Sequence, residues 1–253
     1  MKIGIQISSL REFLQTSEGV RESFRAMSAI GYRVIQMQWV SPSVPIEVVK
    51  DALDESELLC IGTQGSYDEV IPNLDSVVTM NELWGGHSIC VSGIPERFLS
   101  ADGIVRFAAE LDETARRLRD RGKVLVFHPR SQEFAPFGGR AALEIVMDNT
   151  DDAVQVGLDL YHVNKAGHDP VAWVHAAKAR MEWAHFKDGM AGPDGVERLM
   201  PIGQGSIAWQ PIIEACTAAG VKWGFAEQER WQKDPIECLA ESYEYLTRHG
   251  LEG

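Results

Sequence analysis

The sequence predicts a (β/α)₈ TIM barrel, and two features of the chain support this fold class. Short runs rich in β-branched or aromatic residues recur eight times along the 253 residues, and each is followed by a longer segment with apolar residues at helical spacing. A chain of roughly 250 residues is also the usual size of such a barrel. No G-x-G-x-x-G follows the first run, and no Pro-, Gly- or Ser-rich linker divides the chain. We therefore expect one domain over residues 1–253 and no dinucleotide-binding sheet.

Each expected element can be placed by its residues. The expected strands are Lys2 to Ile7, Arg33 to Met37, Leu59 to Gly62, Ser88 to Val91, Val124 to His128, Gln155 to Leu160, Met181 to Phe186 and Trp223 to Glu227. The expected helices are Gly19 to Ile30, Pro45 to Leu53, a weaker one within Glu69 to Leu83, Ala101 to Arg121, Arg140 to Asp148, Pro170 to Ala177, Trp209 to Ala219 and Pro235 to His249. Gly189 to Ser206 is glycine-rich and predicts a long functional loop after the seventh strand.

Composition and charge exclude several classes of partner. The formal net charge of -13 argues against a protein that binds nucleic acid or an anionic membrane through clustered lysines and arginines. The four cysteines form no C-x-x-C pair, so we expect reduced, buried thiols and no zinc ribbon. The apolar run Met1 to Ile7 is too brief for a secretory signal or a membrane span, which predicts a cytoplasmic protein.

Candidate site residues gather at the ends of the last four strands. In a parallel barrel the carboxyl ends of the strands surround one pocket. Glu133, Asp159, His185 and Glu227 lie at or just beyond those ends, and such carboxylate and imidazole ligands suit one divalent ion: Mn²⁺, Co²⁺, Mg²⁺ or Zn²⁺. Four ligands would leave positions open for substrate oxygens, as in a catalytic site.

Other polar residues near these strand ends have two readings. His128 and His162 are second choices as metal ligands and better choices for substrate contact. Lys187 could bind a phosphate or a hydroxyl, or could form a structural ion pair with Asp188 or Glu133. Asp159 could likewise belong to a structural salt bridge, although a carboxylate in an apolar strand is seldom buried without a partner.

A series of motifs in order along the chain resembles the sugar phosphate isomerase/epimerase family of xylose isomerase-like TIM barrels. The motifs are Gly4-Ile5-Gln6, Ile30-Gly31-Tyr32, the stretch His128 to Phe134, Gly157-Leu158-Asp159 with His162, Ala166-Gly167-His168-Asp169-Pro170, His185-Phe186-Lys187-Asp188, Pro201-Ile202-Gly203-Gln204-Gly205 and Glu227-Gln228. The resemblance runs nearly from end to end, and the family includes ketose 3-epimerases, inosose dehydratase and, more distantly, endonuclease IV.

The resemblance implies a mechanism and roles for individual residues. It places metal ligands at Glu133, Asp159, His185 and Glu227, and it makes Glu133 and Glu227 the catalytic pair that removes and returns a proton through a metal-stabilised enediolate. It also places His128, His162 and Lys187 against the substrate, and the departure at Arg130 adds a cation that we expect to contact the substrate. Arg130 stands where many relatives have a second histidine, which favours an anionic substrate. Strand two carries Gln36 where relatives often have a glutamate.

The expected function is therefore a divalent-metal-dependent isomerase or epimerase of a small sugar, sugar phosphate or keto-sugar. A dehydratase or lyase acting on a keto-sugar or keto-inositol on the same metal site is an alternative, and so is a non-catalytic sugar-binding barrel. An endonuclease IV-like role ranks last, because the chain is acidic and has too few histidines at its strand ends. A homo-oligomer is compatible with the sequence.

Overall fold

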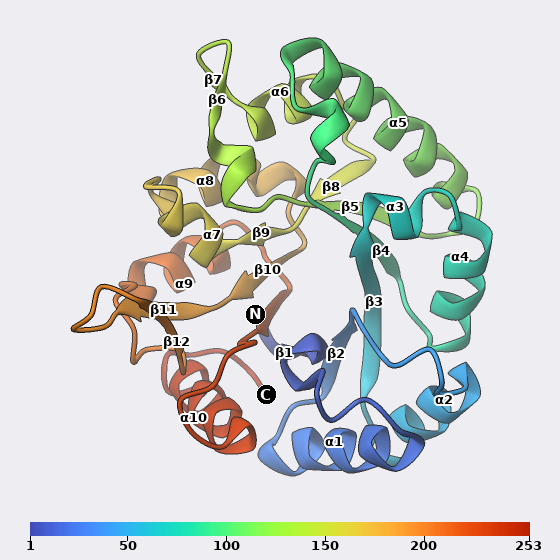
Figure 1. Cartoon of the computed structure of the whole chain (residues 1–253), viewed down its shortest axis with the longest axis vertical. Coiled ribbons are helices and arrows are strands. Elements are labelled where there is room, and N and C mark those ends of the chain that lie inside the picture. The colour runs from blue at the N-terminus through green and yellow to red at the C-terminus, as the bar shows by residue number, and fades with distance from the viewer.

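The computed structural model describes all 253 residues and forms a nearly closed barrel of parallel strands surrounded by helices (Figure 1). The sheet order is β8-β5-β4-β3-β2-β1-β13-β10-β9. Its two outer members, β8 and β9, are consecutive parts of one chain segment separated only by Gly157, so the two ends of the sheet meet there. Strands alternate with helices, which confirms the predicted (β/α)₈ barrel.

All eight predicted strand positions are occupied. The barrel strands are β1 Lys2–Gln6, β2 Val34–Met37, β3 Leu59–Ser66, β4 Ser88–Ser92, β5 Val124–His128, β8 Val154–Val156, β9 Leu158–Asp159, β10 Trp183–Phe186 and β13 Trp223–Ala226. The helices are α1 Ser17–Ile30, α2 Ile46–Glu55, α3 Tyr67–Val70, α4 Leu74–Leu83, α5 Ala101–Arg119, α6 Ala142–Asp148, α7 Leu160–Lys165, α8 Pro170–Ala177, α9 Trp209–Ala218 and α10 Pro235–Arg248. None of the helices is both long enough and apolar enough to cross a lipid bilayer.

Two small hairpins and two short helices were not expected from the sequence. The hairpins are β6 Pro136–Phe137 with β7 Arg140–Ala141, and β11 Asp188–Ala191 with β12 Glu197–Met200. Both project from the barrel in Figure 1. The second hairpin lies almost wholly inside the segment expected to be a loop, Gly189 to Ser206, because the glycines and charged residues of this segment leave no apolar run that would predict a strand. The short helices α3 and α7 each begin directly at the end of a strand.

The apolar side chains form two separate cores. The larger one lies between the sheet and the helices, whereas five residues form a small cluster inside the barrel: Val34, Cys90, Val126, Trp183 and Phe225. These five belong to five different strands and make a floor across the barrel. Gly157 is required beside this floor, because a Cβ there would lie 2.2 Å from the Trp183 ring.

Asp188, the fully buried first residue of β11, lies two residues beyond the end of β10 and anchors the segment that follows β12. Its carboxylate accepts hydrogen bonds from Gly203 N at 2.9 Å, Gly205 N at 3.1 Å and Trp209 Nε1 at 2.8 Å. Gly205 has no side chain for a steric reason, since a Cβ there would lie 2.1 Å from Asp188 Oδ1. One carboxylate thus joins the β11–β12 hairpin and the start of α9 to the barrel.

We expect Asp188→Ala to lower the free energy of unfolding by about 3 kcal/mol or more, because several buried N–H donors would lose their acceptor. Urea denaturation followed by circular dichroism measures the change. Asp194→Ala is the matched control, since this exposed aspartate of the same hairpin pairs only with Arg198 and a local N–H, and its loss should cost much less than that of Asp188. Equal costs for the two variants would contradict the anchoring role.

Candidate functional site

The polar side chains of the site stand directly above the floor of the barrel. Each floor residue is followed, two positions further along its strand, by a polar residue: Gln36 follows Val34, Ser92 follows Cys90, His128 follows Val126, His185 follows Trp183 and Glu227 follows Phe225. Side chains two residues apart on a strand point to the same face, so these polar groups also point into the barrel, toward its carboxyl end. The register pairs His185 with Asp159, which adds a carboxylate to the layer.

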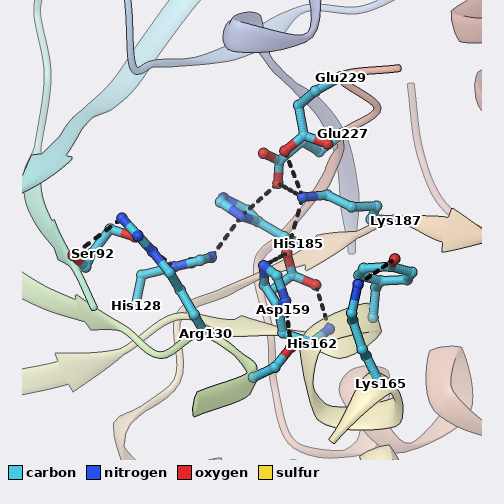
Figure 2. A network of polar contacts seen from close by, with 12 residues as sticks. Ser92, His128, Arg130, Asp159, His162, Lys165, His185, Lys187, Glu227 and Glu229 are labelled. Carbon is cyan, nitrogen blue, oxygen red and sulfur yellow. Dashed lines mark hydrogen bonds and ion pairs between the residues drawn. The ribbon is translucent and has the colours of Figure 1, made fainter. Parts of the chain in front are cut away.

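Three of these side chains could hold a metal ion. One ligand atom each from His128, Asp159 and His185 lies within 4.8 Å of the other two, and all three residues are buried. His128 Nε2 lies 3.0 Å from His185 Nδ1, and Glu227 Oε2 lies 3.0 Å from the same His185 nitrogen. Figure 2 shows His185 between His128 and Glu227. The four side chains therefore converge on one point.

Two carboxylate oxygens in this group fit a bound cation. Asp159 Oδ2 and Glu227 Oε2 are buried without a well-aligned hydrogen-bond donor. The other Asp159 oxygen, Oδ1, accepts a hydrogen bond from His162 N at 3.0 Å and so caps α7. Oδ2 therefore remains available to bind a cation. Buried carboxylate oxygens without donors are costly unless a cation compensates them.

The cation that lies beside these oxygens in the structure is the ammonium of Lys187, which is 3% exposed. Its Nζ lies 3.4 Å from Asp159 Oδ2, 3.3 Å from Glu227 Oε2 and 2.8 Å from Glu229 Oε1 (Figure 2). The structural partners expected for Lys187 were Asp188 or Glu133, and neither is in contact with it. Lys187 instead belongs to the polar group at the strand ends.

The charges of this group determine its ionisation. Burial alone would raise the pKa of Asp159 and of Glu227, but the charges of Lys187 and of the neighbouring histidines together outweigh it and hold both pKa values below their usual range. Burial and the charge of Glu227 raise the pKa of Glu229 to about 7. Burial, followed by the charge of His185, lowers the pKa of His128 well below its usual value. At neutral pH the site therefore contains two ionised carboxylates, an ammonium and a neutral His128.

A chain of hydrogen bonds fixes the ring of His185. Ser8 N donates to Gln6 Oε1 at 3.1 Å, so the Gln6 amide nitrogen faces Gln36 and donates to its Oε1 at 3.1 Å. His185 Nε2 lies 2.5 Å from that same Gln36 oxygen. An amide oxygen is only an acceptor, so His185 directs an Nε2–H at Gln36, and its Nδ1 faces His128 and Glu227, where it can bind a metal when the ring is neutral. The backbone thereby selects the tautomer that can bind a metal.

His128 is held by the neighbouring strand. Its Nδ1 lies 3.1 Å from Ser92 Oγ, which also accepts a hydrogen bond from Arg130 Nε at 3.2 Å. Arg130 was expected at or near the pocket. In the structure its guanidinium lies at the end of β4, against Ser92 and Gly93. Arg130 therefore contacts the site through Ser92.

The structure does not bring Glu133 to the metal-capable group. Glu133 is fully buried, and its Oε1 accepts a hydrogen bond from Ile94 N at 2.8 Å while its Oε2 accepts one from Arg130 N at 2.6 Å. Gln132 Nε2 also donates to Oε1, at 2.9 Å. Both carboxylate oxygens therefore stabilise the loop after β5, and His128 occupies the fourth corner of the group.

A small cavity opens beside this group at the carboxyl end of the barrel. Its volume is about 280 Å³, and its lining consists of Tyr161, His162, Lys165, Lys187, Leu199, Glu229 and Arg230. His162 reaches it with a partly exposed ring, and its Nδ1 lies 2.8 Å from Ser131 Oγ. Two residues expected to face the substrate, His162 and Lys187, thus line the cavity together.

Sequence reasoning missed Ser92, gave Gln6 and Gln36 no role in the site, and left Glu229 as a second carboxylate that binds solvent or Arg230. A signal for Gln6 and Ser92 was present: polar residues that stand two positions beyond inward-facing residues of a strand point into the barrel. The same rule places His128 beside His185. Glu229 follows the end of its strand, where the alternation no longer applies.

Comparison with known proteins agrees with this architecture. Residues 24–249 match the family model described as xylose isomerase-like TIM barrel. A sugar phosphate isomerase/epimerase from Parabacteroides distasonis superposes with a TM-score of 0.83 at 18% identity, covering 97% of this chain and 93% of the other. The 3-keto-D-glucoside 4-epimerase YcjR from E. coli superposes with a TM-score of 0.72 at 19% identity, covering 98% of this chain and 99% of the other.

A third similar structure contains a metal. The IOLI protein with a bound zinc atom superposes with a TM-score of 0.78 at 14% identity, and 98% of each chain is covered. A comparison with curated protein sequences gave no significant match. At these identities the solved structures establish the fold, and the family model covers most of the chain. The chain therefore belongs to the xylose isomerase-like TIM barrel family.

Proposed function

We propose that the protein is a divalent-metal-dependent isomerase or epimerase that moves a proton on a small sugar or keto-sugar. The observation that carries this proposal is the convergence of His128, Asp159 and His185, with Glu227 at 3.0 Å, on one buried point at the carboxyl end of the barrel. Active sites of TIM barrels lie at that end. The family and its similar structures, several of which are sugar isomerases or epimerases, support an enzyme of this class.

The proposed metal ligands differ from the set expected from the sequence at one position. Asp159, His185 and Glu227 remain, and His128 replaces Glu133, whose two oxygens are already used by backbone donors. Nitrogen and oxygen ligands of this kind suit Mn²⁺, Co²⁺ or Zn²⁺. When bound, such an ion would stabilise negative charge that develops on a substrate oxygen.

The protein's own residues supply the proton chemistry. Glu227 is ionised at neutral pH, since nearby Lys187 holds its pKa low, and it can therefore accept a proton from a carbon beside a carbonyl group. Lys187 lines the cavity and donates to Glu229, so its ammonium can bind a substrate hydroxyl or carbonyl oxygen. His162 lines the same cavity and orients the substrate. Arg130 steadies His128 through Ser92.

A lyase is the second candidate, and the position of Lys187 favours it specifically. Its ammonium lies 3.3 Å from the proposed base Glu227, so the pair could remove a proton and protonate a departing hydroxyl group on the same substrate. Incubation with a panel of ketoses in D₂O distinguishes the two reactions. An isomerase exchanges a carbon-bound proton for deuterium and yields an isomer, whereas a lyase yields a product that has lost water. If the protein bound a sugar measurably but produced neither an isomer nor a dehydrated product from any sugar, the result would support a non-catalytic barrel.

We expect Glu227→Gln to lower kcat by about 10³-fold or more, because the amide can neither accept the proton nor bind the ion as a carboxylate does. Glu133→Gln is the matched comparison: we expect a lower melting temperature and a kcat within about tenfold of wild type, because this carboxylate holds the loop and not the substrate. Steady-state kinetics and thermal unfolding of both variants provide the test. A loss of kcat at Glu133 as large as that at Glu227 would restore Glu133 as the second catalytic glutamate.

We expect Gln36→Leu to weaken divalent-metal affinity by roughly 10- to 100-fold, because His185 would lose the acceptor that fixes its tautomer. Titration with a metal-sensitive dye measures the affinity without any substrate. Gln64→Leu is the control, since this buried glutamine of β3 has no side-chain hydrogen bond to His185. If both variants bound metal equally well, the hydrogen-bond chain from Ser8 would have no role in the site.

We expect His162→Ala to keep its metal and to raise KM, because His162 lines the cavity while its Nε2 stays 3.7 Å from Asp159 Oδ2. Asp159→Asn should lose the metal and the activity together. Metal analysis beside steady-state kinetics separates these roles, and a metal-free His162→Ala protein would show that the division is mistaken.

A further inference from the structure

The amino end of the barrel carries a second hollow, on the side opposite the candidate site. Its volume is about 380 Å³, and it lies where the segments that precede β4, β5, β10 and β13 approach the end of α5. Basic side chains dominate its polar lining: His87, Arg119, Lys123, Lys178 and Lys222. Glu182 is the one carboxylate among the lining residues.

The local charge of this hollow is opposite to that of the whole chain. The protein has 37 Asp and Glu residues against 24 Lys and Arg residues, with a net charge of -13. The hollow nevertheless combines four lysines and arginines with a single glutamate, a local excess of three positive charges before His87 is counted. A concave surface focuses such a field, so the hollow attracts anions even though the protein repels them overall.

The single carboxylate is already neutralised. Glu182 accepts a hydrogen bond from Lys222 Nζ at 2.6 Å, and His87 Nε2 lies 3.3 Å from its other oxygen. This bridge spans the amino end of the barrel, from the segment before β4 to the segments before β10 and β13. The remaining cations are therefore not balanced by Glu182.

Two of these cations have no partner within the protein. Arg119 and Lys178 form no side-chain hydrogen bond and no ion pair, and both are exposed at the rim of the hollow. Arg119 lies in the last turn of α5, where a positive charge favours the helix. Lys178 likewise caps the end of α8, whereas Lys123 and Lys222 are already engaged, with Gly86 O at 2.6 Å and with Glu182. The base of the hollow is apolar and includes Ala115, so it offers no carboxylate that could pair with Arg119 or Lys178.

We propose that this hollow binds a small phosphate-bearing anion. Arginine and lysine form charge-assisted hydrogen bonds to phosphate oxygens, and Arg119 and Lys178 are free to do so. A volume of about 380 Å³ accommodates a small metabolite. The apolar base of the hollow would then contact the carbon part of the ligand. This site is separate from the proposed metal group and does not depend on its chemistry.

Isothermal titration calorimetry of the full chain with inorganic phosphate and with tripolyphosphate tests the proposal. The protein is first dialysed free of divalent metal, so that neither anion can bind through an ion at the other end of the barrel. The test variant is Arg119→Gln/Lys178→Gln. The matched control is Arg106→Gln/Arg117→Gln, which removes two exposed arginines of α5 that do not line the hollow and changes the net charge equally.

We expect tripolyphosphate to bind wild type at about one site per chain, and more tightly than phosphate. The test variant should bind it on the order of tenfold more weakly or worse, and the control should match wild type. If both variants bound tripolyphosphate equally weakly, net charge alone would explain the loss and the proposal would be overturned. The absence of binding to wild type would overturn it as well. A His185→Ala variant that bound the anion as wild type does would confirm that the anion does not occupy the metal group.

Discussion

The two-residue repeat of the barrel strands is the constraint on which the site depends. It sets one layer of large apolar side chains across the barrel and a polar layer directly above it, so that the position of each floor residue fixes the position of a site residue. Trp183 shows this directly: its ring stacks on that of His185 with centroids 4.8 Å apart. Gly157 has no side chain, which leaves room for that indole. The rigid floor thereby positions the ligands before any ion or substrate arrives.

The polar layer places two carboxylates in a buried environment, and the surrounding residues compensate them. Lys187 supplies a positive charge to Asp159 and Glu227, and the chain from Ser8 N through Gln6 and Gln36 orients His185. These contacts come from the ends of β1, β2, β9, β10 and β13, strands that are consecutive in the barrel and, for the most part, far apart in sequence. The closed sheet is thus required for the site, since no single segment contains enough of it.

Most of the barrel could be predicted from the sequence because its strands are short, apolar and regularly separated by helices. The same regularity located Asp159, His185 and Glu227, which sit at or directly after strand ends. Glu133 lies five residues beyond His128, in a short helical turn whose backbone donors bind its carboxylate. Strand periodicity does not extend into such a turn, so the direction of the Glu133 side chain could not be read from it. The two hairpins escaped because their segments are polar and contain glycine, so they lack the apolar run that marks a barrel strand.

The central claim is that the four side chains at the strand ends hold one divalent ion. Inductively coupled plasma mass spectrometry measures it directly, on wild type and the His185→Ala variant after dialysis against Mn²⁺, Co²⁺, Mg²⁺ or Zn²⁺ and then against metal-free buffer. The account predicts about one ion per wild-type chain with at least one of these metals and none in the variant, because a metal site requires its full ligand set. Wild-type protein that retained no ion under any of these conditions would contradict it.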